Sequence, residues 1–277
     1  MSLKGSFLRP HCAGRAKNET SVALAPSTDG EINGIGIQPM NIIEKKYVDG
    51  TYLKNKPTWD FEDSLWKAQW VAEILDHNKI CPNSICDVGC GSGGVIKFLR
   101  KSYPHSELFG FDISADASLF WQKHDSLNIS FQVGDFIELN AKKYDVLLLL
   151  DVIEHLSDPY LFLTALRKHS SYCLFHFPLD LSAVNVLRET PILNSREKFG
   201  HINFFTKNLA LSILKECGYH VIDWCYSGAA FTAPQRNRKT LLASFPRRIF
   251  YKMNKDFGVR LLGGETLFVL AQSEILA

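Results

Sequence analysis

The sequence lacks the features that mark membrane-spanning, secreted and disulfide-stabilised proteins. No run approaches about 18 uninterrupted apolar residues, so no membrane span is predicted. The N-terminus has no charged region followed by the apolar run of a signal peptide. The seven cysteines include no C-x-x-C pair, which favours free thiols over a disulfide framework. These absences together predict a cytoplasmic protein.

Strong charge and a compact set of metal ligands are missing as well. The net charge is only +2 over 277 residues, which argues neither for nor against nucleic acid as a partner of the whole molecule. His, Asp and Glu form no tight ligand cluster along the chain, so no metal is expected. The apolar share of 46% is enough to build a sizeable core. Nothing in the sequence indicates an oligomeric state.

A glycine-rich turn between a strand and a helix is the first positive feature. Residues 85–88 form a short apolar strand, Gly89, Gly91 and Gly93 follow it, and residues 95–100 continue as a helix. Glycine permits a positive φ and lets a ligand come close to the backbone. The helix N-terminus adds free N–H groups that favour a polar or anionic group. The turn therefore predicts a cofactor cradle at the carboxyl end of a strand.

Apolar runs alternate with helical patterns along most of the chain. The predicted strands are residues 85–88, 107–112, 129–133, 144–151, 172–177, 219–226 and 266–271. Helices are predicted at 115–124, at 158–168 and after Thr206, and an irregular segment at 181–198. Strands that alternate with helices indicate βαβ units. The predicted fold class is therefore α/β, with a seven-stranded, mostly parallel, doubly wound sheet.

Four carboxylates stand at successive strand ends: Asp87, Asp112, Asp135 and Asp151. Right-handed crossovers place the carboxyl ends of parallel strands along one edge, so these side chains are expected to share a pocket with the glycine turn. One acid at a strand end is usually a cap or a turn residue. Four of them in register with a glycine turn indicate a binding site. Asp87, two residues before Gly89, suits a cofactor with a cationic amine better than a pyrophosphate.

Three segments resemble class I S-adenosylmethionine-dependent methyltransferases of the small-molecule type. The sequence D-V-G-C-G-S-G at 87–93 is similar to their first motif, and D-V-I-E-H-L at 151–156 is similar to their D-x-x-x-H-L segment. The G-H-I-N-F-F-T run at 200–206 also looks like these enzymes. The resemblance implies a Rossmann-like class I methyltransferase fold, S-adenosylmethionine as cofactor, and a small-molecule acceptor. It covers about residues 85–160, the cofactor half of the fold.

The composition of the N-terminal residues and the resemblance together suggest a domain organisation. The predicted organisation comprises a weakly ordered arm at 1–40, a helical lid at 41–80, and a methyltransferase core at 81–277 with a basic insertion at 227–264. Trp66 and Trp70 lie four residues apart, as one apolar helix face requires. Two interpretations of that helix stay open: it packs on the sheet, or it belongs to a lid over the cofactor.

The resemblance assigns cofactor roles to individual side chains. Asp112 would accept both ribose hydroxyls, because an ionised carboxylate is acceptor-only with two oxygens. Asp135 would accept from the adenine amino group, and Lys67 would either pair with the methionine carboxylate or remain solvated. The implied cofactor-binding residues are Trp59, Lys67, Asp87, Gly89, Cys90, Gly91, Gly93, Asp112, Ile113, Asp135, Phe136 and Asp151.

The acceptor side is expected beyond the fifth strand. His201 is a candidate general base, because histidine is neutral and proton-accepting near pH 7; alternatively it hydrogen-bonds to backbone and shapes its loop. His155 and His176 are further candidates. Substrate-binding candidates are Asp180, Arg247 and Arg248.

The basic insertion has several possible interpretations. Residues 234–262 carry many Lys and Arg against Asp256 alone. This pattern fits a solvated helix face, an anionic substrate such as a sugar nucleotide, a peripheral contact with an acidic membrane surface, or RNA.

Methyl transfer to an oxygen or nitrogen of a small molecule is the predicted function, with a sugar or surface-polysaccharide precursor as one acceptor class. An NAD-dependent Rossmann oxidoreductase is an alternative, although the G-x-G-x-G spacing and Asp87 argue against it. A methyltransferase-like binding protein without catalysis is another.

Overall fold

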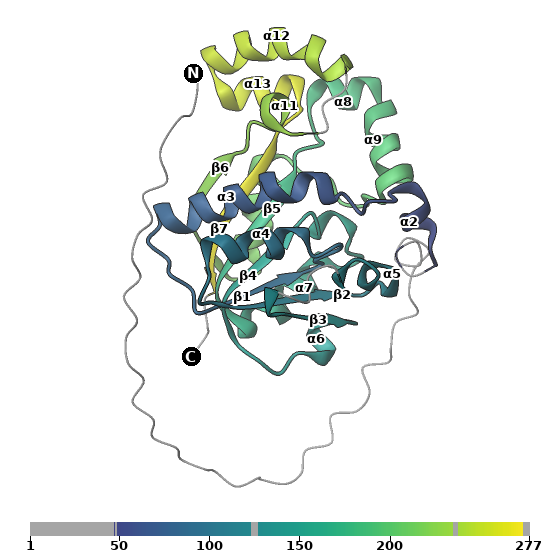
Figure 1. The fold of residues 1–277 in the computed structure, drawn as a ribbon. Helices are drawn as coiled ribbons and strands as arrows, with labels where there is room; N and C mark the ends of the chain where they lie inside the picture. The colour runs from purple at the N-terminus through teal and green to yellow at the C-terminus, as the bar shows by residue number, and fades with distance from the viewer. Residues whose placement is uncertain (1–46, 48, 123–126, 235–237, 274–277) are drawn as a thin grey trace, which may run out of the picture. The chain divides into compact units, whose positions relative to one another are not determined.

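The computed structural model describes residues 47, 49–122, 127–234 and 238–273, so the predicted arm at 1–40 lies outside the described part. Seven strands form one sheet in the order β3-β2-β1-β4-β5-β7-β6 (Figure 1). They are β1 (Ser84–Val88), β2 (Glu107–Asp112), β3 (Ile129–Val133), β4 (Tyr144–Leu150), β5 (Ser170–Pro178), β6 (Tyr219–Tyr226) and β7 (Thr266–Ser273). The neighbouring pairs among β1 to β5 are parallel, whereas β7 pairs antiparallel with both β5 and β6. The predicted fold class is confirmed.

The central strand β4 is buried on both faces of the sheet. Leu147 and Leu149 belong to one apolar cluster, whereas Val146 and Leu148 belong to the other. This division follows from the alternation of side chains along a strand. A near-continuous apolar run is what a parallel strand covered on both faces requires.

Different helices cover the two faces of the sheet. The helices α3 (Ser64–His77) and α4 (Gly94–Ser102) pack on one face. On the other face lie α6 (Phe136–Leu139), α7 (Pro159–Leu166) and α10 (Lys207–Glu216). Trp70 of α3 stacks on Phe268 of β7 with ring centroids 5.8 Å apart. This is the sheet packing that one of the two interpretations of this helix predicted.

Short helical elements complete the cofactor half of the fold. They are α2 (Thr51–Asn55), η1 (Phe61–Asp63), α5 (Ala115–Ser118), η3 (Ile153–His155) and η4 (Arg167–His169). The helix predicted at 115–124 begins where expected, because Ser114 caps its first turn by accepting from the Asp116 N–H. Its α-helical part ends at Ser118, and residues 123–126 lie outside the described part.

The segment predicted to be irregular at 181–198 is helical. It forms α8 (Ala183–Arg188), α9 (Thr190–Asn194) and η5 (Ser195–Phe199). The Ser182 hydroxyl caps α8 by accepting from the Asn185 N–H, and Pro191 stands in the first turn of α9, where a missing N–H costs nothing. The irregular assignment was wrong because these two start signals were not recognised. The Thr206 cap of α10 is confirmed.

The basic insertion between β6 and β7 is also helical. It contains α11 (Ala229–Thr232), α12 (Arg238–Met253) and α13 (Lys255–Leu262). Ser227 and Thr266 close its base, with the Ser227 N–H donating to the Thr266 carbonyl at 3.1 Å and the two hydroxyls 2.6 Å apart. Among the described helices, none combines the length and the apolar character needed to cross a bilayer.

Candidate active site

The glycine turn after β1 is tied to the end of β2. The N–H groups of Gly89 and Cys90 both donate to the Phe111 carbonyl, at 2.8 and 2.9 Å. Gly91 has a φ of 51°, and a Cβ there would stand 2.6 Å from Trp59 Cδ1. Only glycine therefore fits at this position. The backbone of the turn is held in a fixed shape beside the β2 carboxyl end.

Asp112 joins this turn to the rim of the sheet. Its Oδ2 accepts from the Gly91 N–H and its Oδ1 from the Ser114 N–H, both at 2.8 Å. Each oxygen keeps lone-pair capacity for a further donor such as a ribose hydroxyl. Burial, only partly offset by these two backbone hydrogen bonds, raises the pKa of Asp112 to about 6. The carboxylate fits the ribose role that the resemblance implies.

Asp87 is the second buried acid of the rim. It lies within β1, and only 2% of it is exposed. Burial raises its pKa to about 7; Lys67 opposes this shift and Asp112 adds to it. A buried carboxylate with this raised pKa is stabilised by a cationic ligand, such as the amine of an amino-acid tail. Asp87 and the glycine turn lie next to each other in the chain, and their contact with S-adenosylmethionine stays a prediction.

Aromatic side chains cover the turn. Trp59 and Trp121 belong to one small apolar cluster with Cys90 and Ala117. The Trp121 Nε1–H donates to the Gly91 carbonyl at 2.9 Å. These contacts place Trp59 directly on the glycine turn, as its predicted cofactor role requires.

The residues predicted around the adenine lie in different settings. Asp135 is exposed and caps α6, its Oδ1 accepting from the Ile137 N–H at 2.6 Å. Ile113 is exposed next to Asp112. Phe136 is buried in the core, its ring edge-on to Phe111. Asp135 and Ile113 are therefore accessible to a ligand, and the adenine contact of Phe136 stays a prediction.

Asp151 is the centre of a chain of polar contacts directly after β4. Its Oδ2 lies 2.6 Å from Lys67 Nζ, and its Oδ1 lies 2.5 Å from His176 Nδ1. Burial opposes ionisation, yet His176 and Lys67 hold the pKa of Asp151 well below its usual range. The pair with Asp151 raises the pKa of Lys67 to about 12 despite the cost of burial. Lys67 is thus not the solvated lysine of one interpretation.

The three candidate histidines differ in how their nitrogens are engaged. Both nitrogens of His176 are occupied, since Nε2 lies 2.7 Å from the Thr266 hydroxyl. His176 therefore orients Asp151 and has no nitrogen left for a substrate. His155 Nδ1 contacts the Tyr47 hydroxyl, and His201 Nδ1 contacts Asp180 Oδ2, both at 2.8 Å. Burial, reinforced by His201, lowers the pKa of His155 to about 4.

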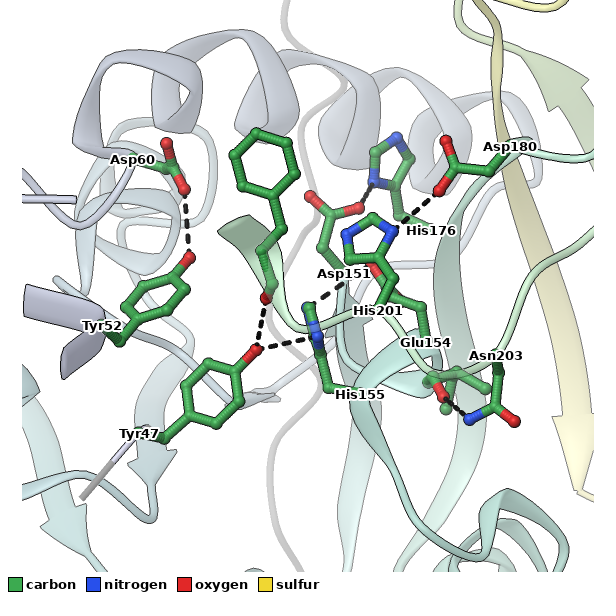
Figure 2. A network of polar contacts seen from close by, with 12 residues as sticks. Tyr47, Tyr52, Asp60, Asp151, Glu154, His155, His176, Asp180, His201 and Asn203 are labelled. Carbon is green, nitrogen blue, oxygen red and sulfur yellow. Dashed lines mark hydrogen bonds and ion pairs between the residues drawn. The ribbon is translucent and has the colours of Figure 1, made fainter. Parts of the chain in front are cut away.

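Figure 2 shows the imidazole rings of His155 and His201 side by side, with Asp180 beyond one ring and Tyr47 beyond the other. Glu154 lies in the same cluster, fully buried, and neither of its carboxylate oxygens has a hydrogen-bond partner among the described residues. Burial, with Asp151 and Asp180 nearby, raises the pKa of Glu154 well above its usual range. Sequence reasoning missed Tyr47 and Glu154. The one signal for Glu154 was its position beside His155 in the D-x-x-x-H-L segment.

The two arginines proposed for the substrate lie on α12. The Arg247 guanidinium donates to the carbonyls of Gly263 and Leu262, at 3.0 and 3.3 Å, and so ties α12 to the end of α13. Arg248 lies over the Phe231 ring at 5.7 Å. Both side chains have local partners, and a substrate contact by either stays a prediction.

Comparison with known proteins identifies the family. A family model described as a methyltransferase domain matches residues 61–223, more than half of the chain. The malonyl-(acyl-carrier protein) O-methyltransferase of Halalkalibacterium halodurans is 27% identical over 130 residues, covering 42% of this chain and 48% of that protein. The ubiquinone biosynthesis O-methyltransferase of Rickettsia typhi is 33% identical over 105 residues, covering 34% and 39%. The chain thus spans less than half the length of these curated relatives.

A solved structure shows the same fold. Magnesium protoporphyrin IX methyltransferase from Synechocystis, with bound S-adenosylhomocysteine (SAH), aligns at a TM-score of 0.52 and 16% identity, covering 86% of this chain and 90% of that one. The family match, the strand order and the cradle formed by Asp87, Gly91 and Asp112 agree with one another. The chain therefore belongs to the methyltransferase domain family and has the fold of the class I methyltransferases.

Proposed function

We propose that this protein transfers the methyl group of S-adenosylmethionine to an oxygen or nitrogen of a small molecule, with a sugar or surface-polysaccharide precursor as one acceptor class. The observation that carries the proposal is the pairing of His201 with Asp180 on the carboxyl side of the sheet, in the same cluster as Asp151. Curated relatives named as O-methyltransferases support an oxygen acceptor.

The chain's own residues would divide the work between positioning and proton removal. The bound cofactor supplies an electrophilic sulfonium methyl group that leaves a neutral thioether after in-line attack. Asp112, Asp87 and the turn at Gly91 would fix the adenosyl group and its amino-acid tail, so that alignment provides much of the rate. Asp180 accepts from His201 Nδ1–H and leaves Nε2 free to take the acceptor's proton.

His201→Ala is expected to lower the turnover number by about 100-fold or more, because a positioned general base contributes roughly that much. SAH affinity is expected to stay nearly unchanged, since His201 is not part of the cradle. Turnover is measured with a labelled methyl group over a panel of hydroxyl and amine acceptors, and SAH affinity by calorimetry. His220→Ala, an exposed histidine on β6, is the matched control. Equal turnover of the His201→Ala and wild-type proteins would leave His201 a purely structural residue.

The two alternative functions make different predictions. Thermal stabilisation by NAD but not by SAH would contradict the proposal and support an oxidoreductase. A protein that binds SAH and methylates no acceptor in the panel would support a binding protein without catalysis.

A further inference from the structure

Glu154, His155 and His201 come together in this site, with Glu154 buried and the two histidines partly exposed. Glu154, His155 and His201 each place one nitrogen or oxygen atom within 4.8 Å of the other two. The Glu154 side chain is 0% exposed, and within the part of the chain that the structure describes neither of its oxygens has a hydrogen-bond partner. A buried carboxylate without a donor is costly, so its position calls for a positive partner.

The hydrogen bonds of Tyr47 determine which nitrogen of His155 carries the proton. The single Tyr47 O–H donates to the Phe199 carbonyl at 2.8 Å. Its oxygen must therefore accept from His155 Nδ1–H, also at 2.8 Å. Neutral imidazole carries one N–H, so His155 Nε2 holds a lone pair. This Nε2 lies 3.8 Å from Glu154 Oε1, too far for a hydrogen bond.

Asp180 determines the proton position on His201 in the same way. An ionised carboxylate only accepts, so the 2.8 Å contact is a hydrogen bond from His201 Nδ1–H to Asp180 Oδ2. The Nε2 of His201 is left with a lone pair. The cluster thus holds two imidazole lone pairs and one carboxylate, and none of these atoms is offered a hydrogen by the other two.

We propose that Glu154, His155 and His201 bind one divalent transition-metal ion. Two ligands at about 2.0–2.2 Å from a common ion stand at most about 4.4 Å apart. The 3.8 Å separation of His155 Nε2 and Glu154 Oε1 is within this distance. The other separations between ligand atoms are at most 4.8 Å, so a small rotation of a side chain brings them within it. Asp180 and Tyr47 serve as outer partners that fix the tautomer and orientation of each imidazole, as partners of metal-bound histidines do.

The ligand set selects the kind of ion. Two imidazoles and one carboxylate suit Zn²⁺ and its transition-metal neighbours, whereas Mg²⁺ prefers oxygen ligands throughout. With Glu154 ionised on binding the cation, Glu154 and Asp180 would together offer two negative charges, which match a divalent cation. A proton in place of the ion would satisfy one oxygen of Glu154 and leave the two imidazole lone pairs without a partner.

The metal ion would take part in the proposed methyl transfer, and this role of the ion rests on the proposed function. Three protein ligands leave a coordination position open for an oxygen of the acceptor, and a bound cation lowers the pKa of a coordinated hydroxyl. The acceptor class would then be a molecule with a hydroxyl or carboxylate oxygen at the methylated position. His201 would act as a ligand instead of taking the proton itself.

Metal binding is tested on the full chain after treatment with a chelator and dialysis. Zn²⁺ is titrated by equilibrium dialysis with metal quantification, and Mg²⁺ is titrated in parallel. We expect one equivalent of Zn²⁺, bound more tightly than Mg²⁺. The variants Glu154→Gln and His201→Gln should each weaken Zn²⁺ binding by more than about 100-fold, and Asp180→Ala by about 10–100-fold. Glu73→Gln and His220→Gln, both at exposed positions, should leave Zn²⁺ binding unchanged.

SAH binding to the same samples shows that each variant is folded. Absence of Zn²⁺ binding to folded wild-type protein would overturn the proposal, and so would Zn²⁺ binding that survives in either folded ligand variant. The methyl-transfer assay separates this proposal from the preceding one. Methyl transfer at an undiminished rate after chelation, without Zn²⁺ binding, would contradict the proposed metal site and support the proposed function. Stoichiometric Zn²⁺ binding without methylation of any acceptor would support the metal site and contradict the proposed function.

Discussion

Asp112→Ala is expected to weaken SAH binding by about 100-fold or more. The carboxylate has capacity for two ribose hydroxyls, and hydrogen bonds to a charged group are worth about 1.5–3 kcal/mol each. The same substitution removes the acceptor of the Gly91 and Ser114 N–H groups, which loosens the turn itself. Calorimetry with SAH measures the affinity directly.

Glu107→Ala is the matched control for this substitution. Glu107 is the first residue of β2, the strand that ends at Asp112, and it is exposed at the opposite end of that strand. It should leave SAH affinity unchanged. If Asp112→Ala bound SAH as tightly as wild type, the ribose role of Asp112 would be refuted and the cradle would have to lie elsewhere.

Asp87→Asn is expected to stabilise the cofactor-free protein at pH 8 by about 2–4 kcal/mol. The pKa of Asp87 is about 7 in the folded protein, against about 3.9 in an unfolded chain. Between these values the folded state binds a proton that the unfolded state has released. Stability from this group is therefore present below about pH 4 and is lost as pH rises to about 7. Asn carries no charge at any pH. The stability of Asp87→Asn relative to wild type therefore rises between about pH 4 and pH 7 and is largest above about pH 7.

Urea unfolding at pH 4.5, 6 and 8 measures this effect, with the exposed Glu107→Gln substitution as the control. The stability difference between Asp87→Asn and wild type should grow from the lowest to the highest pH. The same variant should bind SAH more weakly, because the partner of the cationic amine is gone. A difference that stays constant with pH would show that burial does not raise the Asp87 pKa.

Much of the fold was predictable because its signals are local. The residue bounds of β2 and β3 agree with the predicted strands, since each is a short apolar run that ends at a turn. The acids at the rim followed from topology, because parallel strands present their carboxyl ends on one side. The error at 181–198 also has a local cause, since several short helices leave no sustained periodicity to detect.

The polar cluster at the acceptor side was less predictable. Tyr47, Glu154 and His201 come from three distant segments, and only the assembled sheet and loops bring them together. The expectation of no metal rested on ligands along the chain, and of Glu154, His155 and His201 only the first two are adjacent in sequence. Its premise was wrong, because the fold completes a cluster with His201. The partnerless state of Glu154 is a property of tertiary packing, which no local pattern encodes.

The insertion between β6 and β7 begins and ends at two residues that contact each other, Ser227 and Thr266. Ser227 and Thr266 meet across an antiparallel strand pair, so a segment of any length leaves and re-enters the sheet at the same place. Lengthening such a loop adds little entropic cost, because that cost grows only with the logarithm of its length. Helices α11 to α13 also pack on the body, since Val259 of α13 belongs to the core cluster and Lys207 Nζ of α10 lies 2.8 Å from Asp256 Oδ1. A change in the length of the insertion is therefore tolerated at Ser227 and Thr266 only where these contacts are kept.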